Sequence, residues 1–248
     1  MRLTFANARV WRYVMSSVGK FIEIGLLIVD DNGLVFKAMD PSRVSLVEFL
    51  IPKESFDEFE IEGEAKIMIN VEDLAKILRT SEKDDRITLE WGENTLSLIF
   101  ERKGIPRTFI IPLQLDAEIE AIPELKLELK NTFKVMGVTL YEGITSIEDV
   151  GDVLRFETGE NELHMKSISD LGEAEIVFDL NSGTLLEAEV NEPNISVSYG
   201  LEYFSYIKQA IKMAETVTIM LGSEMPCQLI LDLPQGAKMN YYVAPRID

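Results

Sequence analysis

The sequence predicts an α+β protein made of two similar domains, each with antiparallel sheets and two helices. Three observations carry this prediction: a pattern that returns after 130 residues, short segments in which apolar and polar residues alternate, and four segments with helical periodicity. A chain of 248 residues has room for two domains that each bury a core.

The repeat is clearest between the segments that start at Glu72 and at Glu202, which also end alike in Gly92 and Gly222. The segment around Asn32 returns at an offset of 129 instead of 130, which is the effect of a one-residue loop insertion. Chance similarity between alternating strands is the alternative interpretation. Because the offset holds over two strand regions and two helices, duplication is favoured, and a period this long indicates domains rather than a solenoid.

Alternation of apolar and polar residues predicts a series of strands. They cover residues 22–30, 86–91, 95–100, 107–111, 153–156, 163–166, 175–179 and 217–221. Between the first of these and the segment that follows it lies Asn32-Gly33, which is typical of a tight hairpin. The neighbouring Asp30 and Asp31 fit hairpin chemistry better than metal binding.

Helical spacing predicts helices over residues 7–19, 71–80, 132–146 and 201–214. In the last one, Phe204, Ile207 and Ile211 recur at the spacing of a core-facing side. Lys208 and Lys212 are four residues apart, so they share the opposite side.

Each predicted helix carries basic residues on its solvent face, at sites that we expect to be equivalent in the two halves. These residues are Arg9, Arg12, Lys76, Arg79, Lys83, Lys130, Lys134, Lys208 and Lys212. In any one helix, basic residues on the solvent face need no explanation beyond contact with water. Their recurrence in four predicted helices favours a shared role. The net charge of −19 opposes nucleic-acid binding, but residues 1–22 hold no acid and residues 54–64 hold six acids and no base. Basic helices on an otherwise acidic protein could touch DNA in one place and avoid it elsewhere.

We expect a first domain at residues 1–115, a connector at 116–130 and a second domain at 131–248. Pro123 and the acidic composition predict an extended connector rather than a helix. No apolar run reaches the ~18 residues of a membrane span, and the N-terminus has no signal-peptide pattern. The lone Cys227 excludes a disulfide framework and favours a cytoplasmic location.

The sequence offers little catalytic chemistry. The single histidine, His164, lies in an alternating strand, and one cysteine excludes thiolate zinc clusters within the chain. Neither a phosphate-binding loop, a dinucleotide fingerprint nor a nucleophile elbow occurs. We therefore expect no cofactor, no metal site and no enzyme activity. A pair of carboxylates acting as an acid and a base remains the alternative.

Three stretches resemble one family. They are GLVFKAMDPSRVSLVEF at 33–49, Ile122-Pro123-Glu124 in the connector, and NYYVAPRID at 240–248. On these residues the chain resembles the sliding clamps of DNA replication, the proliferating cell nuclear antigen family, in their archaeal form. The chain departs from the eukaryotic members at Arg43, where they usually have histidine, and this difference affects the details of the pocket. Its third predicted helix is also less basic, which affects the expected DNA contacts.

The resemblance implies a clamp fold in which three subunits form a ring, with sheets outside and two helices per domain lining the hole. Such a ring is a processivity factor that encircles duplex DNA without sequence preference, in the cytoplasm at the nucleoid. Its partners would be two further clamp subunits and, through short peptide motifs, replicative polymerase, flap nuclease, ligase and clamp loader, in replication and repair. The residues expected to face DNA are Arg9, Arg12, Lys76, Arg79, Lys83, Lys134, Lys208 and Lys212.

The resemblance also implies a pocket for partner peptides and a subunit interface. The pocket residues are Met39, Arg43, Val44, Leu46, Ile122, Pro123, Pro226, Tyr242, Val243, Ala244 and Pro245. The interface residues are Thr108, Phe109, Ile110 and Ile111 on one strand and Ile176, Val177 and Phe178 on another. The alternative function is an acidic scaffold subunit of the same fold, which binds partners and needs other subunits to form a ring.

Overall fold

The computed structural model describes residues 1–115, 122–123, 125–170 and 172–247. The chain divides into two compact units. Unit 1 comprises Met1–Pro41, Val47–Pro123 and Pro234–Lys238, and unit 2 comprises Ser42–Leu46, Glu124–Leu233 and Met239–Asp248. The predicted domain boundaries follow the order of the chain, whereas residues 42–46 group with unit 2 and residues 234–238 with unit 1. Residues 116–121 and 124 of the predicted connector lie outside the described residues.

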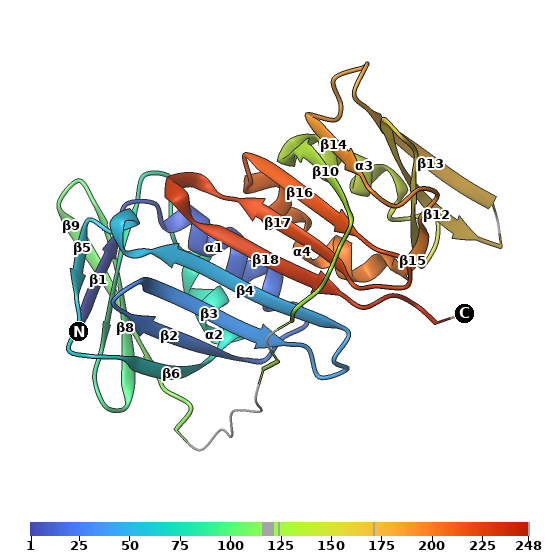
Figure 1. The fold of residues 1–248 in the computed structure, drawn as a ribbon. Coiled ribbons are helices and arrows are strands. Elements are labelled where there is room, and N and C mark those ends of the chain that lie inside the picture. Colours follow the sequence, from blue (N-terminus) through green and yellow to red (C-terminus); the bar gives the residue numbers. More distant parts are fainter. Residues whose placement is uncertain (116–121, 124, 171, 248) are drawn as a thin grey trace. The chain divides into compact units, whose positions relative to one another are not determined.

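Unit 1 contains two antiparallel strand sets and two helices (Figure 1). The strand order is β5-β1-β7-β8-β9 in one set and β4-β3-β2-β6 in the other. The elements are β1 Arg2–Phe5, α1 Ala8–Val18, β2 Ile24–Asp30, β3 Gly33–Met39, β4 Ser45–Pro52, the 3₁₀ turn η1 Lys53–Ser55, β5 Glu58–Glu60, β6 Ala65–Asn70, α2 Val71–Leu78, β7 Arg86–Trp91, β8 Thr95–Arg102 and β9 Ile105–Pro112.

Unit 2 repeats this plan, with the orders β14-β10-β16-β17-β18 and β13-β12-β11-β15. Its elements are β10 Asn131–Met136, α3 Gly137–Ile147, β11 Val153–Thr158, β12 Glu162–Ser169, β13 Gly172–Asp179, β14 Glu187–Val190, β15 Ser196–Gly200, α4 Leu201–Met213, β16 Thr216–Leu221, β17 Cys227–Asp232 and β18 Lys238–Val243, with η2 Pro234–Gly236 between the last two strands.

The strand registers repeat as well. Leu3 faces Leu89 in the β1–β7 pair, and Phe133 faces Ile219 in the β10–β16 pair, 130 positions later. The β2–β3 register returns in β11–β12 at an offset of 129. Both offsets are those of the sequence repeat, so the prediction of two similar α+β domains is confirmed.

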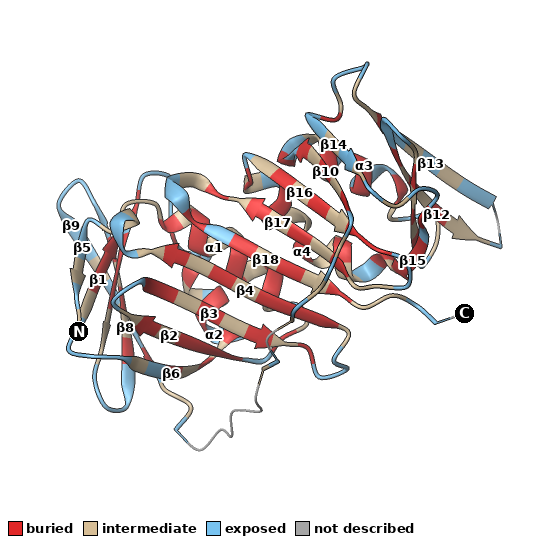
Figure 2. Ribbon diagram, in the orientation of Figure 1, coloured by how far each residue is buried: buried red, intermediate tan, exposed pale blue. Residues whose placement is uncertain are grey.

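One face of each helix builds the core. In α1, Val10, Trp11, Val14 and Met15 are buried, and the Trp11 ring meets Phe49 edge-on at 5.4 Å between centroids. Figure 2 shows the same alternation along the strands, where buried and solvent-facing residues follow one another. Burial of each large apolar side chain contributes about 1.5–3 kcal/mol to folding.

Local chemistry sets where the first two helices begin. Asn7 and Asn70 are the N-caps, and their side-chain oxygens accept hydrogen bonds from the backbone of Arg9 (3.1 Å) and Asp73 (2.9 Å). Asparagine is among the best residues at this position because its oxygen satisfies a free helix N–H. The predicted helices 7–19, 71–80 and 201–214 therefore differ from α1, α2 and α4 only at their ends.

The predicted helix 132–146 is wrong in its first turn, because residues 131–136 form strand β10 and α3 starts at Gly137. The reason is the alternation of Phe133 and Val135, which are buried, with half-buried Thr132 and Lys134. A glycine is required at the start of α3, since a Cβ on Gly137 would lie 2.2 Å from the carbonyl oxygen of Ala214.

The hairpin predicted at Asn32-Gly33 is present between β2 and β3. Asp30 pairs with Gly33, so the turn residues are Asp31 and Asn32, and the Asn32 N–H donates to Asp30 Oδ1 at 2.7 Å. Gly33 itself has φ 141°, a value that side-chain-bearing residues rarely adopt.

Among the described residues, no helix combines the length and the apolar character needed to cross a bilayer. The same part of the chain contains no group of three or more His, Cys, Asp and Glu side chains that could hold a metal ion.

Candidate DNA-facing helices and edge strands

The basic residues of α1 lie on its solvent side. The Arg9 and Arg12 guanidinium carbons lie 5.7 and 5.9 Å from the centre of the Tyr13 ring. Arg12 also donates a hydrogen bond to the carbonyl of Ser81 at 2.8 Å. Within the described part of the chain, no carboxylate forms an ion pair with either arginine. These two cations are therefore held by aromatic and backbone groups and keep their net charge.

The basic residues Lys76, Arg79 and Lys83 do not share one face of α2, as the predicted helix 71–80 required. Lys76 lies on the helix and pairs with Glu72 at 2.9 Å and Asp73 at 3.7 Å. Its hydrogen bond lowers the pKa of Glu72, and the same bond raises the pKa of Lys76. The helix ends at Leu78, so Arg79 is its C-cap and Lys83 lies in the turn beyond it.

The basic residues of unit 2 are also engaged within the chain. Lys208 forms an ion pair with Glu148, and both side chains are mostly buried. The Lys212 ammonium lies 4.6 Å from the centre of the Tyr141 ring. Lys134 is on strand β10 rather than on a helix and pairs with Glu187 at 3.4 Å. Lys134 was predicted to contact DNA because it was expected on a helix, and that reason no longer holds. The residue itself remains a candidate for a DNA contact.

The expectation that the bases occupy equivalent sites in both halves is wrong. The offset of 130 that aligns the strands flanking α2 and α4 places Lys76 on Tyr206 and Lys83 on Met213. Helices α1 and α3, 11 residues each, align at 129, which places Arg9 on Val138. Helix α3 has no basic residue at all, whereas α1 carries Arg9 and Arg12 and α4 carries Lys208 and Lys212.

Strands β9 and β13 each end a strand set, as the predicted interface requires. On β9, Ile110 is 65% exposed and Thr108 is exposed, while Phe109 is half-buried. On β13, Val177 is 41% exposed and Ile176 is half-buried. Ile111 and Phe178 belong instead to the buried faces, at 6% and 2% exposure, so their side chains support the cores of their own units.

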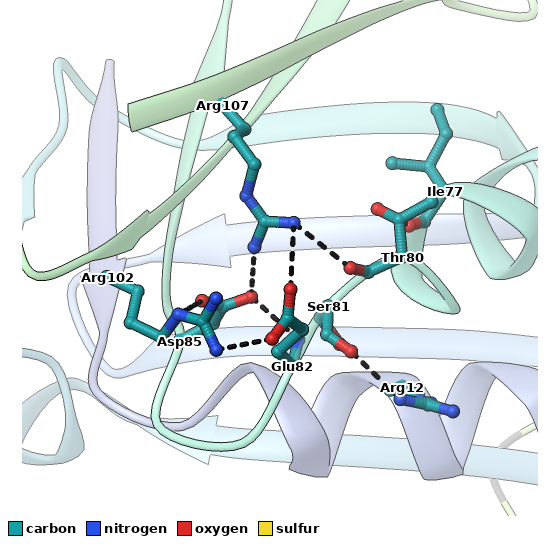
Figure 3. Close-up of polar contacts among 8 residues, drawn as sticks. All are labelled: Arg12, Ile77, Thr80, Ser81, Glu82, Asp85, Arg102 and Arg107. Atoms are coloured by element: carbon teal, nitrogen blue, oxygen red, sulfur yellow. Dashed lines mark hydrogen bonds and ion pairs between the residues drawn. The ribbon is translucent and has the colours of Figure 1, made fainter. Parts of the chain in front are cut away.

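An arginine on β9 also holds the loop that follows α2 (Figure 3). Arg107 pairs with the buried Asp85 and donates to the carbonyl of Thr80 at 3.2 Å. Arg102 lies 3.9 Å from the other Asp85 oxygen and pairs with Glu82, whose N–H donates to Asp85 at 2.7 Å. Residues 79–85 are thereby fixed against the edge strand, and Arg12 fixes their other side through Ser81.

The residues predicted for the peptide pocket are divided between the two units. In unit 2, the predicted residues Ala244 and Pro245 line a hollow of about 880 Å³. The hollow is lined by Arg155, Ser196, Val197, Ser198, Glu224, Ala244, Pro245, Arg246 and Ile247. The Ala244 N–H donates to the carbonyl of Val44 at 2.7 Å, and the Arg246 N–H to that of Ser198 at 2.8 Å. The structure thus brings Val44, Ala244 and Pro245 to one place.

The other predicted pocket residues differ in exposure. Pro226 and Tyr242 are half-buried, and Tyr242 accepts a hydrogen bond from Gln228 at 3.0 Å. Leu46 and Val243 are buried, so they present no side chain to a partner in this conformation. Arg43 is exposed at φ 57°. Met39, Ile122 and Pro123 belong to unit 1; the first two are half-buried and Pro123 is exposed.

The sequence did not indicate the side chains that hold these sites in place. Asp85, Glu148 and Arg155 act across tens of residues, so their partners cannot be deduced from spacing. The Glu72–Lys76 pair did have a signal, because oppositely charged residues four apart on a helix are neighbours.

Two units of one topology, with two helices each and open edge strands, define the DNA-clamp fold. The sequence-family model for the N-terminal domain of proliferating cell nuclear antigen matches residues 1–119 of this chain. DNA polymerase sliding clamp 3 of Sulfurisphaera tokodaii is 35% identical over the whole of both chains, and DNA polymerase sliding clamp 1 of Pyrobaculum aerophilum is 32% identical over 99% of this chain and 98% of its own. A chain in the crystal structure of the PCNA2–PCNA3 complex from Sulfolobus tokodaii superposes with a TM-score of 0.91 at 34% identity, with 99% of each chain covered.

This chain belongs to the proliferating cell nuclear antigen family of DNA polymerase sliding clamps, in agreement with the resemblance seen in its sequence. The clamp of Thermococcus kodakaraensis, at 24% identity and a TM-score of 0.90 over 99% of both chains, shares the fold.

The Asp85 network leads to a stability prediction. Asp85→Ala should lower the free energy of unfolding by about 2–4 kcal/mol, because it leaves Arg107 without its buried partner and frees the loop. Urea unfolding at a fixed protein concentration measures the change. The matched control is Asp84→Asn at the exposed neighbouring position, which should change stability by less than about 0.5 kcal/mol. Equal effects of the two substitutions would show that the network does not stabilise unit 1.

Proposed function

We propose that this chain is a subunit of a ring-shaped clamp that encircles duplex DNA and tethers replication and repair enzymes. The whole-length match to archaeal sliding clamps is the observation that carries the proposal. The two open edge strands, β9 and β13, support it, because a head-to-tail pairing of one with the other closes a ring. The ring is a processivity factor without catalytic activity of its own, acting inside the cell at the nucleoid.

The ring has three subunits, which are either identical or different. One observation favours different subunits: the similar chain from Sulfolobus tokodaii was solved in a complex of two clamp proteins, PCNA2 and PCNA3. In that case this chain is the acidic subunit that needs others to complete the ring. Replicative polymerase, flap nuclease, ligase and clamp loader are the expected clients.

Edge pairing can be tested at two exposed residues. Ile110→Lys and Val177→Lys each place a charge on one edge strand, so each should block one side of a head-to-tail contact. If the chain assembles with itself, light scattering should give three times 28.1 kDa for the wild type and a single-chain mass for each variant. An equimolar mixture of the variants should form dimers, since one intact β9 and one intact β13 remain.

Leu115→Lys, at a residue that is 64% exposed but outside the strand, is the matched control and should assemble as the wild type does. A wild-type chain that forms a ring only with a second clamp protein would establish the mixed assembly. Variants that assemble normally in both settings would exclude these strands as the interface.

DNA binding should depend on the cations that form no ion pair with a carboxylate among the described residues, such as Arg9 and Lys212. Neutralising Arg9 and Lys212 together should reduce the slope of log affinity against log salt by about 0.9 for each phosphate that the ring no longer neutralises. The control pair Lys76→Gln and Lys208→Gln changes the net charge equally, but each ammonium already has a carboxylate partner in the chain. The slope of log affinity against log salt should therefore change less in this control variant than in the Arg9 and Lys212 variant. Fluorescence titration of the loaded ring on duplex DNA measures both, and no change in sequence preference is expected.

Equal slopes for the two double variants would contradict a direct role for Arg9 and Lys212. An unchanged slope in both would remove these helices from the path of the DNA.

Client peptides should bind at the C-terminal hollow of unit 2. Deleting residues 244–248 removes two lining residues with main-chain contacts, Ala244 and Arg246, and leaves Val243 in the core. A peptide from the tail of a replicative polymerase should bind the intact ring at about micromolar affinity, near −8 kcal/mol. We expect the deletion to weaken binding at least tenfold in calorimetry, with the mass of the ring unchanged. Full affinity after the deletion would place the clients elsewhere.

A further inference from the structure

A second hollow lies on unit 1 and shares no lining residue with the C-terminal hollow of unit 2. It measures about 690 Å³ and lies where the tip of the β2–β3 hairpin, the turn η1 and strand β5 meet. Its walls include Pro52, Lys53, Phe56 and Phe59. Neither the edge pairing of β9 nor the basic helices draws on these residues.

The walls of the hollow are aromatic. The rings of Phe56 and Phe59 lie 5.3 Å apart, and the Lys53 ammonium lies 5.4 Å from the centre of the Phe59 ring. Phe56 is anchored from behind by Phe5 at 5.8 Å. Both Phe56 and Phe59 are only half-buried, so part of each ring faces solvent.

The second unit shows that the fold does not require these rings. Thr4 faces Glu58 in the β1–β5 pair, and Lys134 faces Glu187 in the equivalent β10–β14 pair. This register places Phe59 on Ala188, and Phe56 correspondingly on Leu185, which is 2% exposed. The same strand set is therefore completed in unit 2 by one buried leucine and one alanine. The half-exposed aromatic pair is particular to unit 1.

The backbone beside the hollow is open. β5 ends its strand set and pairs only with β1 among the described residues. Two other end strands are covered, because the Gln114 N–H donates to Met68 of β6 at 2.9 Å and the Arg246 N–H donates to Ser198 of β15 at 2.8 Å. An uncovered edge with an apolar hollow beside it has the two parts that recognise an added strand, main-chain pairing and a side-chain pocket.

The charges around β5 select the occupant. Glu58 and Asp57 are paired with Arg2 and Arg86. Glu54, Glu60 and Glu62 form no ion pair with any residue that the structure describes. An acidic peptide would be repelled here, whereas a basic one gains electrostatic attraction.

We propose that β5 and this hollow form a docking site for an extended basic segment of a partner protein, which pairs with β5 and inserts an apolar side chain against Phe59. The segment alternates Lys or Arg with large apolar residues, so that one face meets the hollow and the charges meet Glu60 and Glu62. This site does not depend on ring formation or on the C-terminal hollow.

The test uses full-length protein and the labelled peptide Lys-Val-Lys-Phe-Lys-Val-Lys, with Glu-Val-Glu-Phe-Glu-Val-Glu as the charge-reversed probe. The basic peptide should bind measurably in fluorescence anisotropy, at least tenfold more tightly than the acidic one, and lose affinity as salt rises. The double variant Phe56→Leu, Phe59→Ala introduces the residues that unit 2 uses at these positions, so it should fold and yet weaken binding at least fivefold. Deleting residues 244–248 should leave binding unchanged.

Hydrogen exchange distinguishes strand addition from contact by side chains alone. Within residues 56–62, the amides that face away from β1 should exchange more slowly with the basic peptide bound, because an added strand gives them hydrogen-bond partners. The Phe56 and Asp57 N–H groups already donate to the carbonyls of Lys53 and Thr4, so they should change less. Equal affinity for both peptides, full affinity in the double variant, or unchanged exchange at 56–62 overturns the proposal. A doubled mass without peptide would show that the edge pairs with another copy of the chain instead.

Discussion

Backbone pairing at the ends of the strand sets is the constraint on which the rest of this structure depends. An open end strand exposes a row of N–H and C=O groups that will pair with whatever strand arrives. The segment that leaves the last strand of each unit covers one end, through Gln114 on β6 and Arg246 on β15. Among the other end strands, β9 and β13 expose Ile110 and Val177. Duplication thus provides each chain with two complementary open edges, which is what a head-to-tail ring needs.

Electrostatics adds a second constraint, because the chain carries a net charge of −19 and yet is proposed to hold DNA. Several candidate cations are already compensated within the chain, Lys76 by Glu72 and Lys208 by Glu148. The guanidinium groups of α1 are held over a tyrosine ring instead, which fixes them without cancelling their charge. Few uncompensated contacts would give weak, salt-sensitive attraction, and such attraction allows a ring to slide while its topology keeps it on the duplex.

The sequence was sufficient for whatever depends on local pattern. The spacing of Phe204, Ile207 and Ile211 predicted α4, and alternation predicted β7 to the residue. It was insufficient where distant residues decide. The predicted basic helix face that included Lys83 is wrong because residues 79–85 leave the helix and form a loop. Arginines on β8 and β9 hold this loop through Asp85. The helix predicted from 132 failed because a strand and a helix meet without a break at Gly137, so both periodicities overlap.

The internal repeat also acts as a control within the molecule, because both units have the same topology. Where they agree, as in the β1–β7 and β10–β16 registers, the residues serve the fold. Where the residues of the two units differ, the shared topology does not explain the difference, so another role must explain it. Arg9 corresponds to Val138 on the helices, and the half-exposed Phe59 corresponds to Ala188 at the strand edge. The topology requires neither Arg9 nor Phe59, since unit 2 has the same strand orders without them. The divergent positions are therefore where contacts with other molecules should be sought, DNA at α1 and a basic peptide segment at β5.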